Sequence, residues 1–168
     1  MAKGKVLEVG IGSGLNMPYF DTSKIISVVG IDPSEELIQL AEKRIDDSMP
    51  DVDFVISKAE EMQFNDNSFD TVLITYTMCT VDDVSASLMQ IKRVLKSDGE
   101  LLFCEHGLAP DEKIVKWQNR INKFWPTISG GCNINKNIPH LIGEAGFTIP
   151  NMEQMYLPKT PKILGYNY

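Results

Sequence analysis

A glycine loop that directly follows a short apolar run is the feature that most constrains what this chain can fold into. Residues 5–9 read Lys-Val-Leu-Glu-Val, which predicts a buried strand interrupted by one carboxylate. The loop Gly10–Gly14 follows at once, and residues 15–20 are then expected to form a short helix. Glycine has no Cβ, so a ligand can approach the backbone closely, and a helix N-terminus offers free N–H groups and a positive dipole end. The sequence therefore predicts a ligand cradle that comprises Glu8, Gly10, Ile11, Gly12, Gly14 and Asn16.

The glycine spacing bears on which nucleotide the loop would bind. The dinucleotide fingerprint needs a third small residue after two intervening positions. That position is Leu15 here, and the third glycine falls at Gly14 instead. The spacing disfavours a nicotinamide-dependent oxidoreductase, which we keep as an alternative, together with an ordinary turn between strand and helix.

An acidic residue at the end of the second predicted strand indicates a nucleoside ligand. Residues 25–31 are rich in β-branched side chains and lead into Asp32 and Pro33. Open α/β sheets place a carboxylate for the ribose hydroxyls at such a strand end, about 20 residues beyond the glycine loop. Because Ser34 can cap the next helix, Asp32 is expected to be available to the ribose, with Pro33 beside it.

Strand and helix patterns then alternate along residues 1–105. This order implies an α/β fold with a parallel sheet and helices on both faces. The loops with polar residues all follow carboxyl ends of strands, where such sheets bind nucleotides. Further strands are expected at 52–57, 71–75 and 100–105, helices at 34–46 and 82–95, and a turn at 96–99.

Two segments beside the glycine loop carry a family resemblance. The run Lys58–Asp70 resembles the loop after the third strand in the ubiquinone-biosynthesis-type (methyltransferase type 11) group, and Leu95–Phe103 resembles the same group. The loop Gly10–Gly14 is similar to motif I of the class I S-adenosylmethionine (SAM) methyltransferases. The chain departs from the pattern at Lys58, where the group has an aspartate that accepts a hydrogen bond from adenine.

The resemblance implies a fold, a cofactor and further contacts. It implies a Rossmann-like, seven-stranded, mostly parallel sheet whose last strand is antiparallel, with strands at 147–157 and 162–168. It implies SAM as the methyl donor, with Ala59 and Glu60 at the adenine, and Tyr76 and Thr77 near the transferable methyl group. Such proteins usually have helices before the first strand, and these are missing here; a homodimer that covers this side is one explanation.

The second half of the chain is expected to serve the methyl acceptor. His106 follows the fifth strand and is a candidate general base, and Glu105 competes for that role or orients His106. Tyr76 completes the catalytic set. The helix predicted at 111–125 has an apolar stripe with Trp117 beside a basic stripe, which favours a lid over the site or a peripheral membrane contact. Residues 107–140 are therefore predicted to be a lid or substrate insertion.

The whole pattern resembles small thiol S-methyltransferase-like proteins most closely. We therefore expect methyl transfer to a small or lipophilic acceptor, such as a thiol, a quinol or a lipid-like molecule. A SAM-binding module without catalysis stays open.

Composition narrows the remaining classes. A length of 168 residues predicts a single methyltransferase domain over 1–168, and the net charge of −7 disfavours a nucleic-acid partner. The absence of a leader-like start and three cysteines without metal-site spacing predict a cytoplasmic protein with no metal.

Overall fold

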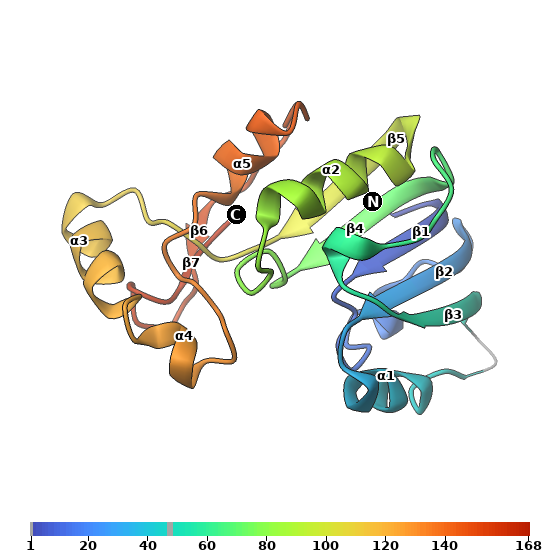
Figure 1. Ribbon diagram of the computed structural model, residues 1–168, viewed down its shortest axis with the longest axis horizontal. Coiled ribbons are helices and arrows are strands. Elements are labelled where there is room, and N and C mark those ends of the chain that lie inside the picture. The colour runs from blue at the N-terminus through green and yellow to red at the C-terminus, as the bar shows by residue number, and fades with distance from the viewer. Residues whose placement is uncertain (1, 47–48) are drawn as a thin grey trace. The chain divides into compact units, whose positions relative to one another are not determined.

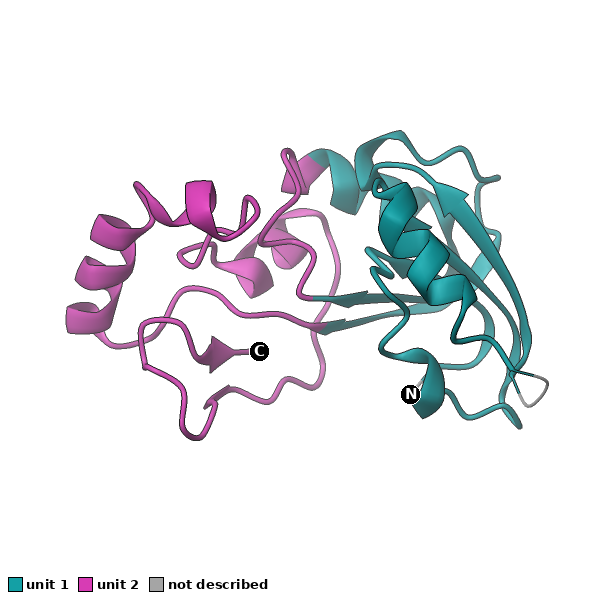
Figure 2. Cartoon of the chain, turned by 90° about the horizontal axis from the view of Figure 1, so that it is seen from below, with its two compact units in different colours: residues 1–75, 86–103 teal, residues 76–85, 104–168 magenta. Residues whose placement is uncertain are grey.

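The computed structural model describes residues 2–46 and 49–168. These residues form two compact units (Figure 2). Unit 1 comprises residues 1–75 and 86–103, and unit 2 comprises residues 76–85 and 104–168. The two units are described separately below, and the assignment of 1–168 to a single domain stays a prediction.

Unit 1 is built on a five-stranded parallel sheet with the strand order β3-β2-β1-β4-β5 (Figure 1). The apolar run of the first strand lies at its centre, where Val6 and Leu7 are fully buried. Val9 pairs with Ile31 on one side and with Ile74 on the other, so the carboxyl ends of three strands are aligned. The strands are β1 (Gly4–Val9), β2 (Ile25–Asp32), β3 (Asp51–Ile56), β4 (Phe69–Thr75) and β5 (Leu95–Cys104).

Two helices, α1 (Glu35–Glu42) and α2 (Val84–Val94), lie on opposite faces of this sheet (Figure 1). Ser34 caps α1, because its Oγ accepts a hydrogen bond from the Leu37 amide at 3.3 Å. The turn predicted at 96–99 instead lies inside β5, which begins directly after α2.

The helix predicted at 15–20 is only a 3₁₀ turn, η1 (Met17–Tyr19). The turn ends at Phe20, whose backbone is extended. The next residue, Asp21, starts a different turn, in which its carboxylate accepts hydrogen bonds from the Ser23 amide and hydroxyl. A turn of three residues has no helix dipole of consequence, so the electrostatic part of the predicted cradle is wrong. A second 3₁₀ turn, η2, spans Ala59–Glu61.

Unit 2 contains three short helices: α3 (Glu112–Ile121), α4 (Trp125–Ile128) and α5 (Ile138–Glu144). Among the described residues of α3, Gln118 is the one that is buried. Among residues 2–46 and 49–168, no helix has the length and apolar character needed to cross a membrane.

The seven-stranded sheet is not formed. The last two strands, β6 (Met155–Tyr156) and β7 (Tyr166–Asn167), form a separate antiparallel pair. The Rossmann-like core is therefore confirmed, but the strand count is wrong. The reason lies in the sequence of 150–161, where three prolines remove backbone donors and leave room only for two-residue strands.

Candidate functional site

The glycine loop of unit 1 is held by backbone hydrogen bonds to β2 and is open on one side. Gly10 and Ile11 donate to the carbonyl of Ile31 at 2.8 and 3.0 Å. Gly12 has a φ of 54°, which a residue with a side chain rarely adopts. A Cβ placed on Gly12 would meet no atom within 4 Å, so this side of the loop is free for a ligand.

Asp32 lies next to the glycine loop. Its Oδ2 accepts from the Gly12 amide at 3.0 Å, and its Oδ1 accepts from the Ser34 amide at 2.9 Å. Each carboxylate oxygen has a second lone pair, so Asp32 can hold the loop and still accept from a vicinal diol. Ser34 caps α1 as expected, and Asp32 in addition holds the glycine loop, a contact that the sequence did not predict.

Glu8 is a buried carboxylate beneath the loop. Its Oε1 accepts from the Asn16 side-chain amide at 2.7 Å, and that amide also donates to Thr75 Oγ1 at 2.8 Å. Its Oε2 is buried and has no hydrogen-bond partner among the described residues. Burial raises the pKa of Glu8 to about 7, although the Asn16 hydrogen bond opposes this shift.

The other predicted cofactor residues of unit 1 are Ile11, Pro33, Ala59 and Glu60, and they differ in what they leave accessible to a ligand. Ile11 turns its side chain into the core beside Met17 and Ile38, so only its backbone is left for a ligand. Pro33 is exposed at the end of β2, and Ala59 follows β3 on the same edge of the sheet, because Asp32 pairs with Ile56. Ala59 is buried, and Glu60 is half-buried.

These residues fit the methionine and ribose parts of SAM. The unpaired oxygen of Glu8 suits an ammonium group, the open side of Gly12 leaves room for a chain, and Asp32 suits a diol. A buried carboxylate oxygen without a partner is uncommon in a folded protein, and a cationic ligand group explains it.

Unit 2 begins with a turn that Glu105 holds in place. Glu105 is fully buried, and its Oε1 accepts from the amides of Thr77 and Met78 at 2.6 and 2.9 Å. Burial raises the pKa of Glu105 to about 7. Tyr76 has a φ of 52°, and its hydroxyl donates to Asn167 Oδ1 at 2.8 Å. Burial also raises the pKa of Tyr76 to about 12, which keeps the phenol protonated.

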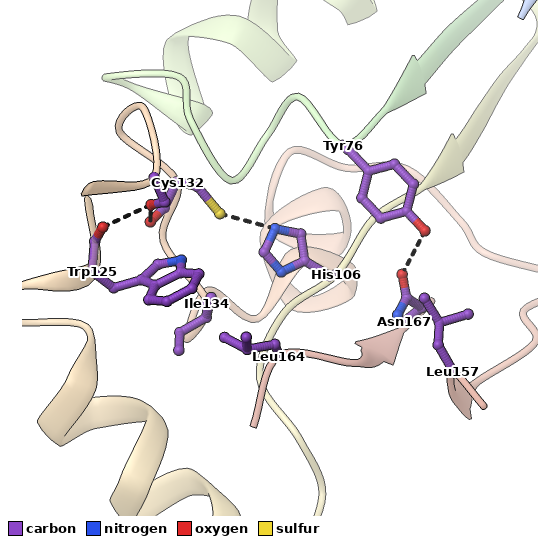
Figure 3. A pocket seen from close by; sticks show the side chains of 9 residues that line it. Tyr76, His106, Trp125, Cys132, Ile134, Leu157, Leu164 and Asn167 are labelled. Atoms are coloured by element: carbon purple, nitrogen blue, oxygen red, sulfur yellow. Dashed lines mark hydrogen bonds between the residues drawn. The ribbon is translucent and has the colours of Figure 1, made fainter. Parts of the chain in front are cut away.

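A cavity of about 300 Å³ lies within unit 2 (Figure 3). Its wall is mostly apolar, with the imidazole of His106 at one side. His106 Nε2 lies 3.1 Å from Cys132 Sγ, and the Cys79 thiol lies beside the same pair. The hydrogen bond between the two thiols lowers the pKa of Cys132 and raises that of Cys79. The lining residues are Tyr76, His106, Trp125, Ser129, Cys132, Ile134, Leu157, Leu164 and Asn167.

Sequence reasoning missed part of this wall. Trp125 lines the cavity, whereas Trp117, which was predicted to cover the site, is 51% exposed. Cys132 is not among the site residues predicted from the sequence; of the other two cysteines, Cys79 lies beside it, whereas Cys104 is exposed. The signal for Cys132 was the preceding Gly130-Gly131 pair, whose positive φ angles of 66° and 89° turn the chain sharply.

Residues 7–103 match the protein family described as methyltransferase domain. Methyltransferase OMS1, mitochondrial, from Saccharomyces cerevisiae is 27% identical over 94% of this chain, and the chain spans 37% of that protein. Thiol S-methyltransferase TMT1B from Rattus norvegicus is 29% identical over 95% of the chain and 68% of its own length. A solved methyltransferase structure from Bacillus halodurans has a TM-score of 0.80 at 21% identity, covering 94% of this chain and 68% of its own.

The chain therefore belongs to the methyltransferase domain family, and it has the Rossmann-like fold of SAM-dependent methyltransferases. The resemblance to class I SAM-dependent methyltransferases is confirmed, and the cofactor of this class is SAM. The family assignment also decides against the nicotinamide-dependent oxidoreductase.

Proposed function

We propose that this chain transfers the methyl group of SAM to a small thiol. The observation that carries the proposal is the small cavity of unit 2, where the His106 imidazole and the Cys132 sulfur lie side by side in the wall. The thiol S-methyltransferase from rat, which is similar over nearly the whole chain, supports the same acceptor class.

Unit 1 supplies the residues for the donor. Glu8 would bind the ammonium of the methionine part, Asp32 would bind the ribose hydroxyls, and Ala59 would lie at the adenine. SAM provides an activated methyl group on a sulfonium, so the protein needs to position the acceptor in line at roughly 3 Å. Thr75, whose Oγ1 accepts from Asn16, is followed directly in the chain by Tyr76 of the cavity wall.

Unit 2 supplies the residues for the acceptor. A free thiol has a pKa near 8.5, so it needs only modest help to react as a thiolate at neutral pH. His106 would take or share the acceptor proton, because its imidazole lines the cavity. Glu105 would act as a positioning residue, since its bound oxygen holds the turn at Thr77 and Met78. Tyr76 would shape the cavity, because its hydroxyl is engaged with Asn167.

The test is methyl transfer from tritium-labelled SAM to separate pools of small thiols, quinols and phospholipids. We expect labelled thioethers and at least a tenfold lower rate in His106→Gln. This is less than the roughly 100-fold low end of typical general-base effects, because a thiol is already acidic enough to ionise with little help. The matched control is His140→Gln, because His140 is exposed and pairs only with Glu144 among the described residues. Label that enters only quinols or phospholipids would reject the thiol, and SAM binding without any transfer would indicate a module without catalysis.

A lipophilic acceptor delivered from a membrane is the second candidate, because apolar side chains of α3, α4 and the link between them are exposed. Trp117, Phe124 and Ile128 are 51%, 75% and 79% exposed. The Arg120 guanidinium lies 5.2 Å from the Trp117 ring. Apolar and basic residues together suit an anionic lipid surface. We propose that vesicles with anionic lipid bind the chain, and that the double variant Phe124→Ser and Ile128→Ser releases it; equal binding by the variant would reject the contact.

A further inference from the structure

Three side chains with strong metal-ligand character converge in unit 2 from separate loops. Cys79 comes from the turn after β4, His106 from the segment after β5, and Cys132 from the loop before α5. Their sulfur and nitrogen donor atoms all lie within 4.8 Å of one another. The chain has only three cysteines and two histidines, so this convergence uses three of these five side chains.

We propose that Cys79, His106 and Cys132 form a binding site for one thiophilic d¹⁰ metal ion, such as Zn²⁺ or Cd²⁺. Zinc–sulfur and zinc–nitrogen bond lengths imply donor-to-donor separations of roughly 3.6–3.8 Å in a tetrahedral site. On metal binding, the 3.1 Å distance between His106 Nε2 and Cys132 Sγ would increase slightly. The Cys79 sulfur, which lies within 4.8 Å of both atoms, would take a similar distance to each of them.

The loops that carry the ligands are fixed by hydrogen bonds to one another. Asn133 donates to the Cys79 carbonyl through its backbone at 2.9 Å and through its side chain at 3.2 Å. Lys136 Nζ donates to the carbonyls of Met78 and Val81, both at 3.0 Å. The Cys132 carbonyl accepts from the Ser129 hydroxyl at 3.3 Å. The loops that carry the donors are therefore held in place before any ion binds, which favours affinity.

The backbone on both sides of His106 is held by the C-terminal segment. The backbone of Glu105 exchanges two hydrogen bonds with Tyr168, at 2.8 and 3.3 Å, and Gly107 donates to Tyr166 at 3.1 Å. His106 lies between these contacts, and its backbone forms an isolated antiparallel β-bridge with Asn167. Since His106 and Cys132 line the cavity of about 300 Å³, the fourth coordination position would face that space. A histidine nitrogen that binds a metal ion cannot accept a proton, so His106 would serve as the base of the proposed function only in the metal-free chain. Two cysteines and one histidine with an open fourth position is a ligand set that zinc enzymes use.

The experiment measures metal binding to the reduced whole chain without SAM, so it does not depend on methyl transfer. Cd²⁺ is titrated by calorimetry, and Co²⁺ is used as a spectroscopic probe of tetrahedral thiolate coordination. We expect one ion per chain and intense visible cobalt bands. Loss of a ligand should weaken binding by about 100-fold or more, since even outer partners of metal ligands are worth 10–100-fold. The ligand variants are Cys79→Ser, Cys132→Ser and His106→Gln.

Matched controls come from the residues of the same types outside the cluster. Cys104→Ser and His140→Gln should bind Cd²⁺ as the unchanged chain does, because Cys104 and His140 are exposed and do not belong to the cluster. Cys132 is only half-buried, so Cys132→Ser carries the test if Cys79→Ser fails to fold. Equal loss in Cys104→Ser, no loss in Cys132→Ser, or no saturable binding would overturn the proposal.

Discussion

The Oδ2 atom of Asp32 accepts a hydrogen bond from the backbone amide of Gly12 at 3.0 Å. This bond ties the end of β2 to the glycine loop that follows β1. Asp32 is 8% exposed, so the bond is shielded from water. The same carboxylate therefore shapes the loop and, in the proposed function, contacts the ribose.

The first prediction separates these two roles of Asp32. In Asp32→Asn the side-chain oxygen can still accept one backbone hydrogen bond, whereas in Asp32→Ala both bonds are lost. We expect both variants to lose SAM affinity by at least tenfold, measured by calorimetry. Asp32→Ala should also lower the free energy of unfolding by about 1–3 kcal/mol, because it leaves two part-buried amides unpaired, and Asp32→Asn should lower it by less, because it leaves one. Unchanged SAM affinity in both variants would reject the ribose assignment.

The second prediction concerns stability and the buried Glu8. Its pKa is raised from 4.5 to about 7 in the folded chain, so between these values the folded state holds a proton that the unfolded state has released. Its contribution to stability is therefore fully present below pH 4.5 and is lost as the pH rises through 7. Glu8→Gln should gain up to about 3 kcal/mol relative to the unchanged chain between pH 4 and pH 8. Urea unfolding at several pH values measures this, and a pH-independent difference would contradict it.

The third prediction concerns the same carboxylate with SAM bound. If the unpaired Oε2 of Glu8 meets an ammonium group, SAM should bind best to the ionised form. Affinity should then fall by up to about tenfold for each pH unit below 7, and Glu8→Gln should bind weakly with little pH dependence. Calorimetry checks this against Asp53→Asn, which alters an exposed carboxylate of β3. An equal pH profile in Glu8→Gln would contradict the ammonium contact.

The sequence predicted the donor half of the chain well, because its signals are local. An apolar run around Leu7, a glycine loop and an acidic residue at the end of β2 need only neighbouring residues to define them. The burial of Leu7 and the cap on α1 agree with these patterns. The role of the Gly12 amide could not be predicted, because it depends on Asp32, which lies in another strand.

The acceptor half was harder to predict, because long-range contacts decide it. The apolar stripe of the helix at 111–125 favoured Trp117 as its inner residue, but the buried residue of α3 is Gln118. No periodicity shows that a glutamine can bind four backbone groups from distant loops. The approach of Cys132 to His106 likewise depends on the turn at Gly130-Gly131. The cytoplasmic location and the homodimer stay predictions.

The fourth prediction tests the packing beneath the glycine loop. A Cβ on Gly30 would lie 2.3 Å from Ile11 Cδ1, so Gly30→Ala must displace the Ile11 side chain. We expect a loss of about 1–3 kcal/mol in the free energy of unfolding and weaker SAM binding, because Ile11 supports the loop. The control is Gly143→Ala in α5, where a Cβ meets no atom within 4 Å. That change should be neutral or stabilise by up to about 1 kcal/mol, and equal melting temperatures for both variants would contradict the prediction.

The fifth prediction concerns the polar centre of unit 2. Gln118 Nε2 donates to the carbonyls of Gly107, Ile134 and Ile163, and its Oε1 accepts from the Ala109 amide at 3.0 Å. Gln118→Leu keeps the volume but leaves these backbone groups without their partner. Since each unsatisfied buried group costs about 1–3 kcal/mol, the variant should lose about 3 kcal/mol or more of stability.

Hydrogen exchange and thermal unfolding measure this loss. The Ala109 amide should exchange much faster in Gln118→Leu, while amides of the β1 strand in unit 1 should keep most of their protection. Lys116→Ala is the control on the same helix, because Lys116 is exposed. If Gln118→Leu unfolds at the same temperature as Lys116→Ala, the hydrogen bonds of Gln118 do not stabilise these loops. Apolar packing of the cavity wall must then hold the loops together.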